Sequence, residues 1–167
     1  DPTAYRLGRC TLNPLKHLDP IGTICLMFAP IGWAKPVPID PRNFRNWRQG
    51  VLVSTAAGPI SNLVQALVFA LLLRGVHILS RQSFVMSFGD PATTMRFLLL
   101  MQEMFLIAVF INVGLAVFNC LPLFPLDGFH ITLQLLRPEA QRNFIRMAPA
   151  GPFILIALVL ISNHSDF

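Results

Sequence analysis

The chain has 167 residues, of which 54% are hydrophobic and 13% are charged, and its formal net charge is +5. The charged share is about half of that in an average soluble domain, so there is too little polar surface for a protein that faces water on all sides. This composition favours an integral membrane protein whose basic loops suit a negatively charged membrane surface. It argues against nucleic-acid binding, because the basic residues lie between apolar segments and form no basic face with interleaved aromatic residues.

The first fifty residues are predicted to form a turn-rich, partly inserted region. Prolines interrupt the first twenty residues, where we expect only a short extended pair around Cys10–Leu12. The segment Ile21–Trp33 is apolar but too short for a full span, which predicts a buried, re-entrant or partly inserted element. Alternating prolines then predict an extended strip over residues 32–41. That strip is either a rigid connector or an exposed edge that pairs with an unwound substrate.

The first clear membrane span is predicted at Val51–Leu73, after a stretch rich in arginine. Gly58 permits close approach of a neighbouring helix, and Pro59 is expected to kink the span. Ser61 and Asn62 follow near the same side, where both are able to hydrogen-bond a neighbour. We interpret Asn62 as a packing residue or a support for a nearby site, more than as a reacting group.

The second clear span is predicted at Phe97–Phe118, after a polar loop in which Asp90 begins a turn or a helix. Glu103 lies inside this span, and we expect it near a helix end or paired within the bundle. Along a helix, Glu103 is about 24 Å from Asn119. That separation is too large for Glu103 to share a metal ion with residues beyond the end of the span.

The second span runs directly into the stretch N-C-L-P-L-F-P-L-D-G-F-H, which begins at Asn119. Pro122 and Pro125 lack a backbone N–H and push the preceding residues out of the α region, so the helix is predicted to end at Asn119. Asp127 then carries a carboxylate in an unwound segment at or near membrane depth, and Gly128 permits unusual backbone conformations. A carboxylate at that depth is costly and suggests a functional site. The alternative is a polar loop beyond the membrane, in which Asp127 caps the next helix.

Apolar residues resume at Phe129–Leu136, a predicted helix, and a polar loop or surface helix with three arginines follows. Ala148–Ile161 is a last apolar run, which reaches the length of a span only if Phe144–Met147 join it. The fold is therefore predicted to be an all-α membrane protein, a bundle of about three transmembrane helices with one unwound at the motif above. We expect a single domain over residues 1–167, with the turn-rich part at 1–50 and the bundle at 51–167.

Metal-binding residues are few in this chain. A catalytic zinc site needs three protein ligands and an open position. The histidines share no i, i+4 spacing, and no His-Glu pair occurs; they are His17, His77, His130 and His164. We interpret His130 as a helix-facing or pocket-lining residue. The three cysteines are too far apart for a C-x-x-C motif and are interpreted as buried small hydrophobic residues; they are Cys10, Cys25 and Cys120.

Four stretches of the sequence together resemble the site-2 protease family of intramembrane zinc metalloproteases. They are residues 6–23, 32–41, 56–62 and 119–128. In the last stretch, Asn119 precedes Asp127 by eight positions with two prolines between them, as in the Asn…Leu-Asp-Gly motif of that family. The resemblance implies that Asp127 is a zinc ligand and that Asn119 positions or polarises the substrate carbonyl. Phe129 departs from the family pattern, because many members have a small residue there.

The resemblance also implies a His-Glu-x-x-His helix that supplies two further zinc ligands and the general base. The printed sequence lacks that helix, so we expect it to precede Asp1 and expect the printed chain alone to be inactive. The implied protein is a multi-pass protease of the bacterial inner membrane that uses zinc and cleaves membrane-associated proteins in regulated intramembrane proteolysis. The alternative is a non-catalytic membrane protein, either an inactive relative or a transporter-like bundle with a broken helix.

Overall fold

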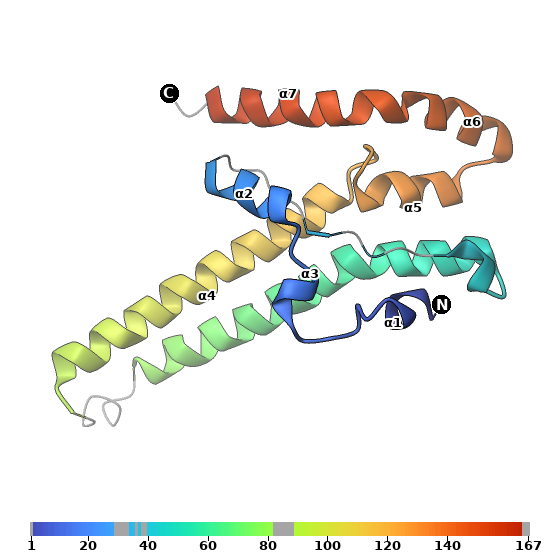
Figure 1. The fold of residues 1–167 in the computed structure, drawn as a ribbon. Helices are drawn as coiled ribbons and strands as arrows, with labels where there is room; N and C mark the ends of the chain where they lie inside the picture. The colour runs from blue at the N-terminus through green and yellow to red at the C-terminus, as the bar shows by residue number, and fades with distance from the viewer. Residues whose placement is uncertain (1, 29–33, 36, 38–39, 82–88, 165–167) are drawn as a thin grey trace. The chain divides into compact units, whose positions relative to one another are not determined.

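The computed structural model describes residues 2–28, 34–35, 37, 40–81 and 89–164. The chain divides into two units, Asp1–Val51 and Leu52–Phe167, and each is described by itself. Within the described residues the regular structure is helical, apart from one isolated antiparallel bridge (Figure 1). The described part of the chain therefore has the architecture of an all-α membrane protein, as predicted.

Short helical elements and turns make up the described residues of the first unit. In chain order these elements are α1 (Thr3–Arg6), η1 (Pro14–Lys16), α2 (Pro20–Phe28) and η2 (Pro41–Asn43). Asp19 precedes α2 and caps its first turn, because its carboxylate accepts hydrogen bonds from the backbone N–H groups of Ile21 and Gly22 at 3.0 and 2.9 Å. The α2 side chains Ile21, Met27 and Phe28 are exposed, so the described part of this segment is a helix but not a buried one.

Extended pairing in the first unit lies elsewhere than predicted. Residues 10–12 form bends, and the bridge joins Leu18 to Ala34. Beside the bridge, the Lys35 N–H donates to the His17 carbonyl at 2.9 Å. The Arg9 guanidinium donates to the carbonyl oxygens of Lys16 and Lys35, and so links the two segments that the bridge joins. Half of the predicted proline-rich strip, including Pro36 and Pro38, lies outside the described residues.

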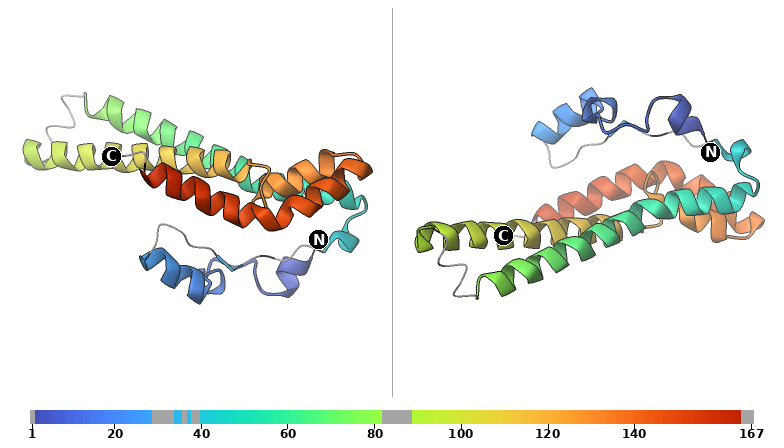
Figure 2. Two further views of the ribbon diagram at one scale, coloured as in Figure 1. Left: turned by 90° about the horizontal axis from the view of Figure 1, so that it is seen from above. Right: turned by 90° about the horizontal axis from the view of Figure 1, so that it is seen from below.

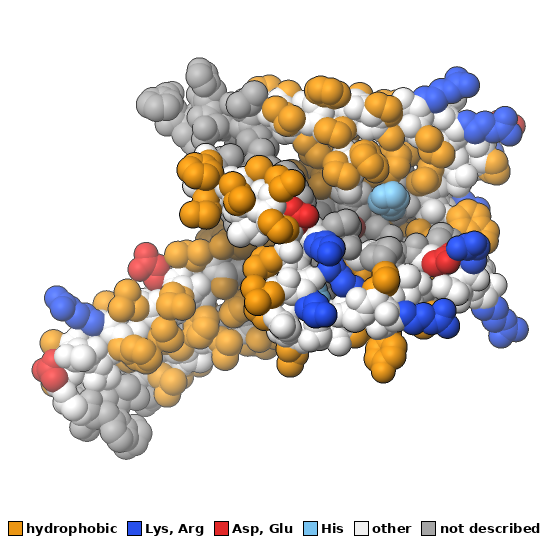
Figure 3. All heavy atoms as spheres, viewed as in Figure 1, with side chains coloured by type: hydrophobic (Ala, Val, Ile, Leu, Met, Phe, Trp, Pro, Cys, Tyr) orange, Lys and Arg blue, Asp and Glu red, His pale blue; other side chains and the backbone are white. Residues whose placement is uncertain are grey.

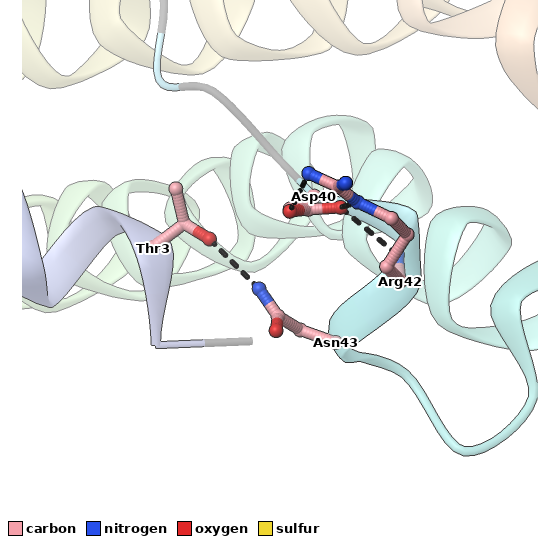
Figure 4. A network of polar contacts seen from close by, with 4 residues as sticks. All are labelled: Thr3, Asp40, Arg42 and Asn43. Atoms are coloured by element: carbon pink, nitrogen blue, oxygen red, sulfur yellow. Dashed lines mark hydrogen bonds and ion pairs between the residues drawn. The ribbon is translucent and has the colours of Figure 1, made fainter.

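Polar side chains link the beginning and the end of the first unit (Figure 4). The Asn43 amide donates to the Thr3 hydroxyl at 3.2 Å, across forty positions of sequence. The Arg42 guanidinium donates two hydrogen bonds of 3.0 Å to Asp40. These hydrogen bonds hold the pKa of the Asp40 carboxyl below its ordinary value. The Arg42 side chain is exposed and Asp40 is half-buried, so this ion pair orients the turn more than it stabilises the unit.

Two apolar helices, α3 (Trp47–Leu79) and α4 (Pro91–Asn119), are long enough to cross a membrane. They confirm the two clear spans of the prediction, although α3 begins before Val51 and continues beyond Leu73. Asp90 caps α4, as predicted: its carboxylate accepts from the backbone N–H of Thr93 at 2.9 Å and from the hydroxyl of the same residue at 2.7 Å.

Helices α3 and α4 lie side by side as an antiparallel pair (Figures 1 and 2). The rings of Phe69 and Phe105 stack with centroids 6.1 Å apart, and the Gln102 amide donates to the Ser80 hydroxyl at 3.3 Å. Glu103 is exposed in the middle of α4, so the expectation of a helix end or a partner within the bundle is wrong for the described residues. The reason is geometric, because Gln102 and Phe105 occupy the side of α4 that faces α3.

The remaining helices are shorter. They are α5 (Asp127–Leu135), α6 (Pro138–Met147), η4 (Ala148–Ala150) and α7 (Gly151–His164). Helix α7 has 14 residues, about 21 Å, and falls short of a hydrocarbon core of about 30 Å. The 3-10 turn η4 separates α7 from α6, so residues 144–147 do not lengthen it. Two helices in the described residues therefore reach the length of a span, where about three were predicted. Hydrophobic side chains gather over α4 and α7 (Figure 3).

Candidate metal centre

The helix break is present where the prolines predict it. Helix α4 ends at Asn119 and α5 begins at Asp127, and the backbone between them forms turns. Within the break, the N–H groups of Leu123 and Leu126 donate to the carbonyls of Leu121 and Leu123, each at 2.8 Å. The peptide bond between Phe124 and Pro125 is cis. Asp127 is thus the first residue of the helix after the break. Leu126 occupies the cap position and no side chain caps α5, so Asp127 does not cap this helix as the second alternative expected.

Glycines allow the break to pack tightly. A Cβ atom at Gly128 would overlap the carbonyl oxygens of Cys120 and Leu121, and one at Gly151 would overlap the backbone of Phe124. Gly128 is therefore needed for close approach of the backbone. The predicted role in an unusual backbone conformation is wrong, because the glycines with positive φ among the described residues are Gly8 and Gly89. Sequence reasoning missed Gly151, whose position in an apolar helix near two prolines was the available signal.

Aromatic rings fix the break against α5 and α6. Phe129 is buried and stacks on Phe144 with ring centroids 4.7 Å apart. The Phe124 ring meets the edge of Phe129 at 5.7 Å, and the His130 ring lies 5.5 Å from Phe129. Such ring pairs stabilise by about 0.5–1.5 kcal/mol each beyond the burial of their surface. The large residue at position 129 therefore fills the space between the break and α6, and the His130 ring lies against the rings of Phe124 and Phe129.

The carboxylate of Asp127 lies against the backbone of α3 at Gly58. A Cβ atom built on Gly58 would lie 2.5 Å from the Asp127 Oδ2 atom and 3.5 Å from Cγ. Asp127 is half-buried and accepts no hydrogen bond from a described residue. It lies outside the two membrane-spanning helices, where burial raises the pKa of its carboxyl and the charge of His130 opposes that rise. The close approach predicted for Gly58 is thus to a carboxylate, and no described residue forms an ion pair with that carboxylate.

The other predicted site residues lie on α3, at the end of α4 and in the break, and none of them hydrogen-bonds the Asp127 carboxylate. Pro59 is buried within α3, which continues as one helix through it. The Ser61 hydroxyl donates to the Gly58 carbonyl of its own helix at 2.7 Å. Asn62 is half-buried one turn beyond Gly58, and Asn119 is half-buried at the end of α4. Neither amide hydrogen-bonds a described residue, so the structure brings Asp127 and Gly58 together but does not join either asparagine to them.

The described residues supply one ligand position and not a complete zinc site. No group of three His, Cys, Asp or Glu side chains among them is placed to hold a metal ion, and zinc needs three. Asp127 fits one of these positions, because it presents carboxylate oxygens that no described donor occupies. The His17 ring contacts the Thr11 carbonyl at 2.8 Å. The cysteines do not contribute, and the expectation that they are buried is wrong: Cys10 and Cys120 are exposed.

Comparison with known proteins agrees with a metal centre. The chain is 38% identical over 159 residues to the "Putative zinc metalloprotease YwhC" of Bacillus subtilis (strain 168), and the match covers 95% of the chain and 68% of that protein. No family model matches the chain, and no solved structure matches it. Fold and site define a helical membrane protein with a carboxylate held at a helix break. The chain belongs to the same zinc metalloprotease family as the Bacillus protein.

Proposed function

We propose that the chain is part of an intramembrane zinc metalloprotease of the site-2 protease type, in which Asp127 is one of three zinc ligands. The observation that carries the proposal is the contact between Gly58 and the Asp127 carboxylate at a packed helix break. A carboxylate in that position is half-buried and free of described donors, which is a costly arrangement unless a cation occupies it. The zinc metalloprotease name of a relative that aligns with 95% of the chain supports zinc as that cation.

Two further ligands and the general base belong, in this proposal, to a His-Glu-x-x-His helix outside the printed sequence. The Bacillus relative is longer than the matched region, which leaves room for such a helix. A catalytic zinc ion, when bound, lowers the pKa of its water to about 7 and so supplies a nucleophile at neutral pH. The described residues complete no site alone, and we therefore expect the printed chain by itself to be inactive.

The chain's own residues have distinct tasks in the proposed reaction. Asp127 holds its carboxylate at the metal position, and the bare backbone of Gly58 fixes where that carboxylate lies. Asn119, at the end of α4, is the group we assign to the substrate carbonyl, because its amide N–H is an uncommitted donor among the described residues. Gly128 and the ring of Phe129 pack the break tightly, and this packing keeps the Asp127 carboxylate at the position that the reaction requires.

We assign the substrate to the class of transmembrane or membrane-associated proteins, and the enzyme to a multi-pass position in the bacterial inner membrane. Helices α3 and α4 are apolar enough to cross a membrane, so a substrate that reaches the break approaches through or along the bilayer. The substrate helix must unwind around the peptide bond that is cleaved, because a helical backbone shields its carbonyl carbons from attack by a nucleophile. Regulated intramembrane proteolysis is the biological process that this chemistry serves.

The test uses the full-length protein in detergent or in vesicles with a transmembrane substrate. Cleavage should be abolished by a zinc chelator and by Asp127→Asn, while membrane insertion remains unchanged. Asp90→Asn is the matched control, because it makes the same chemical change at another helix start and asparagine still caps well. Undiminished cleavage by Asp127→Asn would exclude the ligand role. If the native full-length protein cleaves no membrane substrate in the presence of zinc, a non-catalytic bundle is favoured instead.

A further inference from the structure

Helix α7 begins directly against the backbone of the helix break. Its first residue, Gly151, is buried, and a Cβ atom built there would overlap the Phe124 carbonyl oxygen and lie 2.9 and 3.0 Å from the N and C atoms of Phe124. The φ angle of Gly151 is −52°, which any residue adopts in a helix. The absence of a side chain at position 151 is therefore needed for the contact and not for the backbone conformation.

The contacted residue is connected to both flanks of Asp127. Phe124 lies three positions before Asp127, whereas Phe129 and His130 lie two and three positions after it. The Phe124 ring meets the Phe129 ring at 5.7 Å and the His130 ring at 6.3 Å. A displacement of Phe124 would therefore reach the backbone on each side of the Asp127 carboxylate.

The start of α7 is fixed to the rest of the unit through α6. The Gln141 amide donates to two carbonyl oxygens at the end of α5, at 2.8 and 3.2 Å, and the Phe144 ring stacks on Phe129. The short turn η4 joins α6 directly to Gly151. Since packed interiors transmit strain, an added methyl group at position 151 would push on the break, because α7 is held from the other side.

We propose that Gly151 is a positioning residue for the metal site, because the bare start of α7 sets where the break lies and hence where Asp127 holds its carboxylate. The inference rests on the proposed role of Asp127 as a zinc ligand. Gly58 limits the position of the carboxylate itself, whereas Gly151 limits the position of the backbone that carries it. Groups that orient a ligand without touching the metal typically change metal affinity by about 10- to 100-fold.

The first experiment measures the zinc affinity of the full-length protein in detergent, by competition with a chelator whose absorbance reports free zinc. Gly151→Ala should weaken zinc binding by about 10- to 100-fold. Leu98→Ala is the control, because Leu98 is buried in α4 about 30 Å along the helix from Asn119. It should lower the melting temperature and leave the zinc affinity unchanged. Native affinity in Gly151→Ala, or an equal loss in both variants, overturns the proposal.

The second experiment uses the native protein and so does not depend on the folding of a variant. Coupling between two sites is reciprocal, so zinc binding should slow amide hydrogen exchange in residues 151–155. The first turn of α4, which Asp90 caps, is the internal control and should exchange at the same rate with and without zinc. Zinc that binds without slowing exchange in residues 151–155 overturns this proposal alone. If the native protein binds no zinc, the proposed function fails and this inference fails with it.

Discussion

A methyl group at position 58 should displace the carboxylate on which the proposed site depends. In Gly58→Ala the new Cβ atom would lie 2.5 Å from Asp127 Oδ2, whereas ordinary van der Waals contact begins at 3.4 Å. The carboxylate or the helix must therefore shift by roughly 1 Å to relieve the overlap, and a displacement of that size at a catalytic centre costs about 100-fold in rate. We expect kcat/KM to fall by about that factor, and zinc to bind more weakly.

Gly75→Ala on the same helix is the matched control for this prediction. A Cβ atom at Gly75 would meet nothing within 4 Å, so the substitution adds the same methyl group without a clash. Both variants gain helix propensity, up to about 1 kcal/mol, so neither should lower the melting temperature through the helix itself. The assay compares cleavage of a transmembrane substrate by the full-length native protein and the two variants. If Gly58→Ala cleaves as fast as Gly75→Ala, Gly58 does not position Asp127.

Two further predictions concern residues that pack at the helix break, and a third concerns the cap of α4. Gly128→Ala should lower the melting temperature, because overpacking against two backbone carbonyls costs about 1–3 kcal/mol, and circular dichroism measures the loss. Phe129→Ala removes a buried ring stacked on Phe144 and should destabilise by about 3–5 kcal/mol in the same melt, with Phe129→Leu losing less. The hydrogen bonds from Thr93 hold the pKa of Asp90 below its ordinary value, so the cap of α4 should persist at neutral and mildly acidic pH. It should weaken only as pH falls through that lowered pKa, and amide exchange in the first turn of α4 should then accelerate; unchanged exchange would contradict it.

Local sequence rules predicted the elements that local chemistry determines. Two prolines lack the N–H that a helix needs, so the end of α4 at Asn119 follows from Pro122 and Pro125 alone. The start of α4 likewise follows from Asp90 and Pro91, a cap and a first-turn proline. The two apolar spans follow from length and composition.

Contacts between distant segments could not be predicted in the same way. The sequence marked Gly58 as a site of close approach, but not that the approaching group is the Asp127 carboxylate, 69 positions away. It gave Gly128 a conformational role, whereas the structure requires it for packing against Cys120. Cys120, expected to be a buried small hydrophobic residue, and Glu103, expected near a helix end or paired within the bundle, are both exposed. Which segments pack against a given side chain depends on the tertiary structure, which local sequence does not specify.

Metal content of the full-length protein tests the central claim most directly. The protein purified in detergent, dialysed against trace zinc and analysed by mass spectrometry should contain roughly one zinc ion per chain, as a catalytic site with three ligands requires. Asp127→Asn should lose most of that zinc, while Asp90→Asn keeps it, since only the first of these carboxylates lies against Gly58 at the helix break. Equal zinc content in the native protein and both variants would contradict a role for Asp127 as a metal ligand.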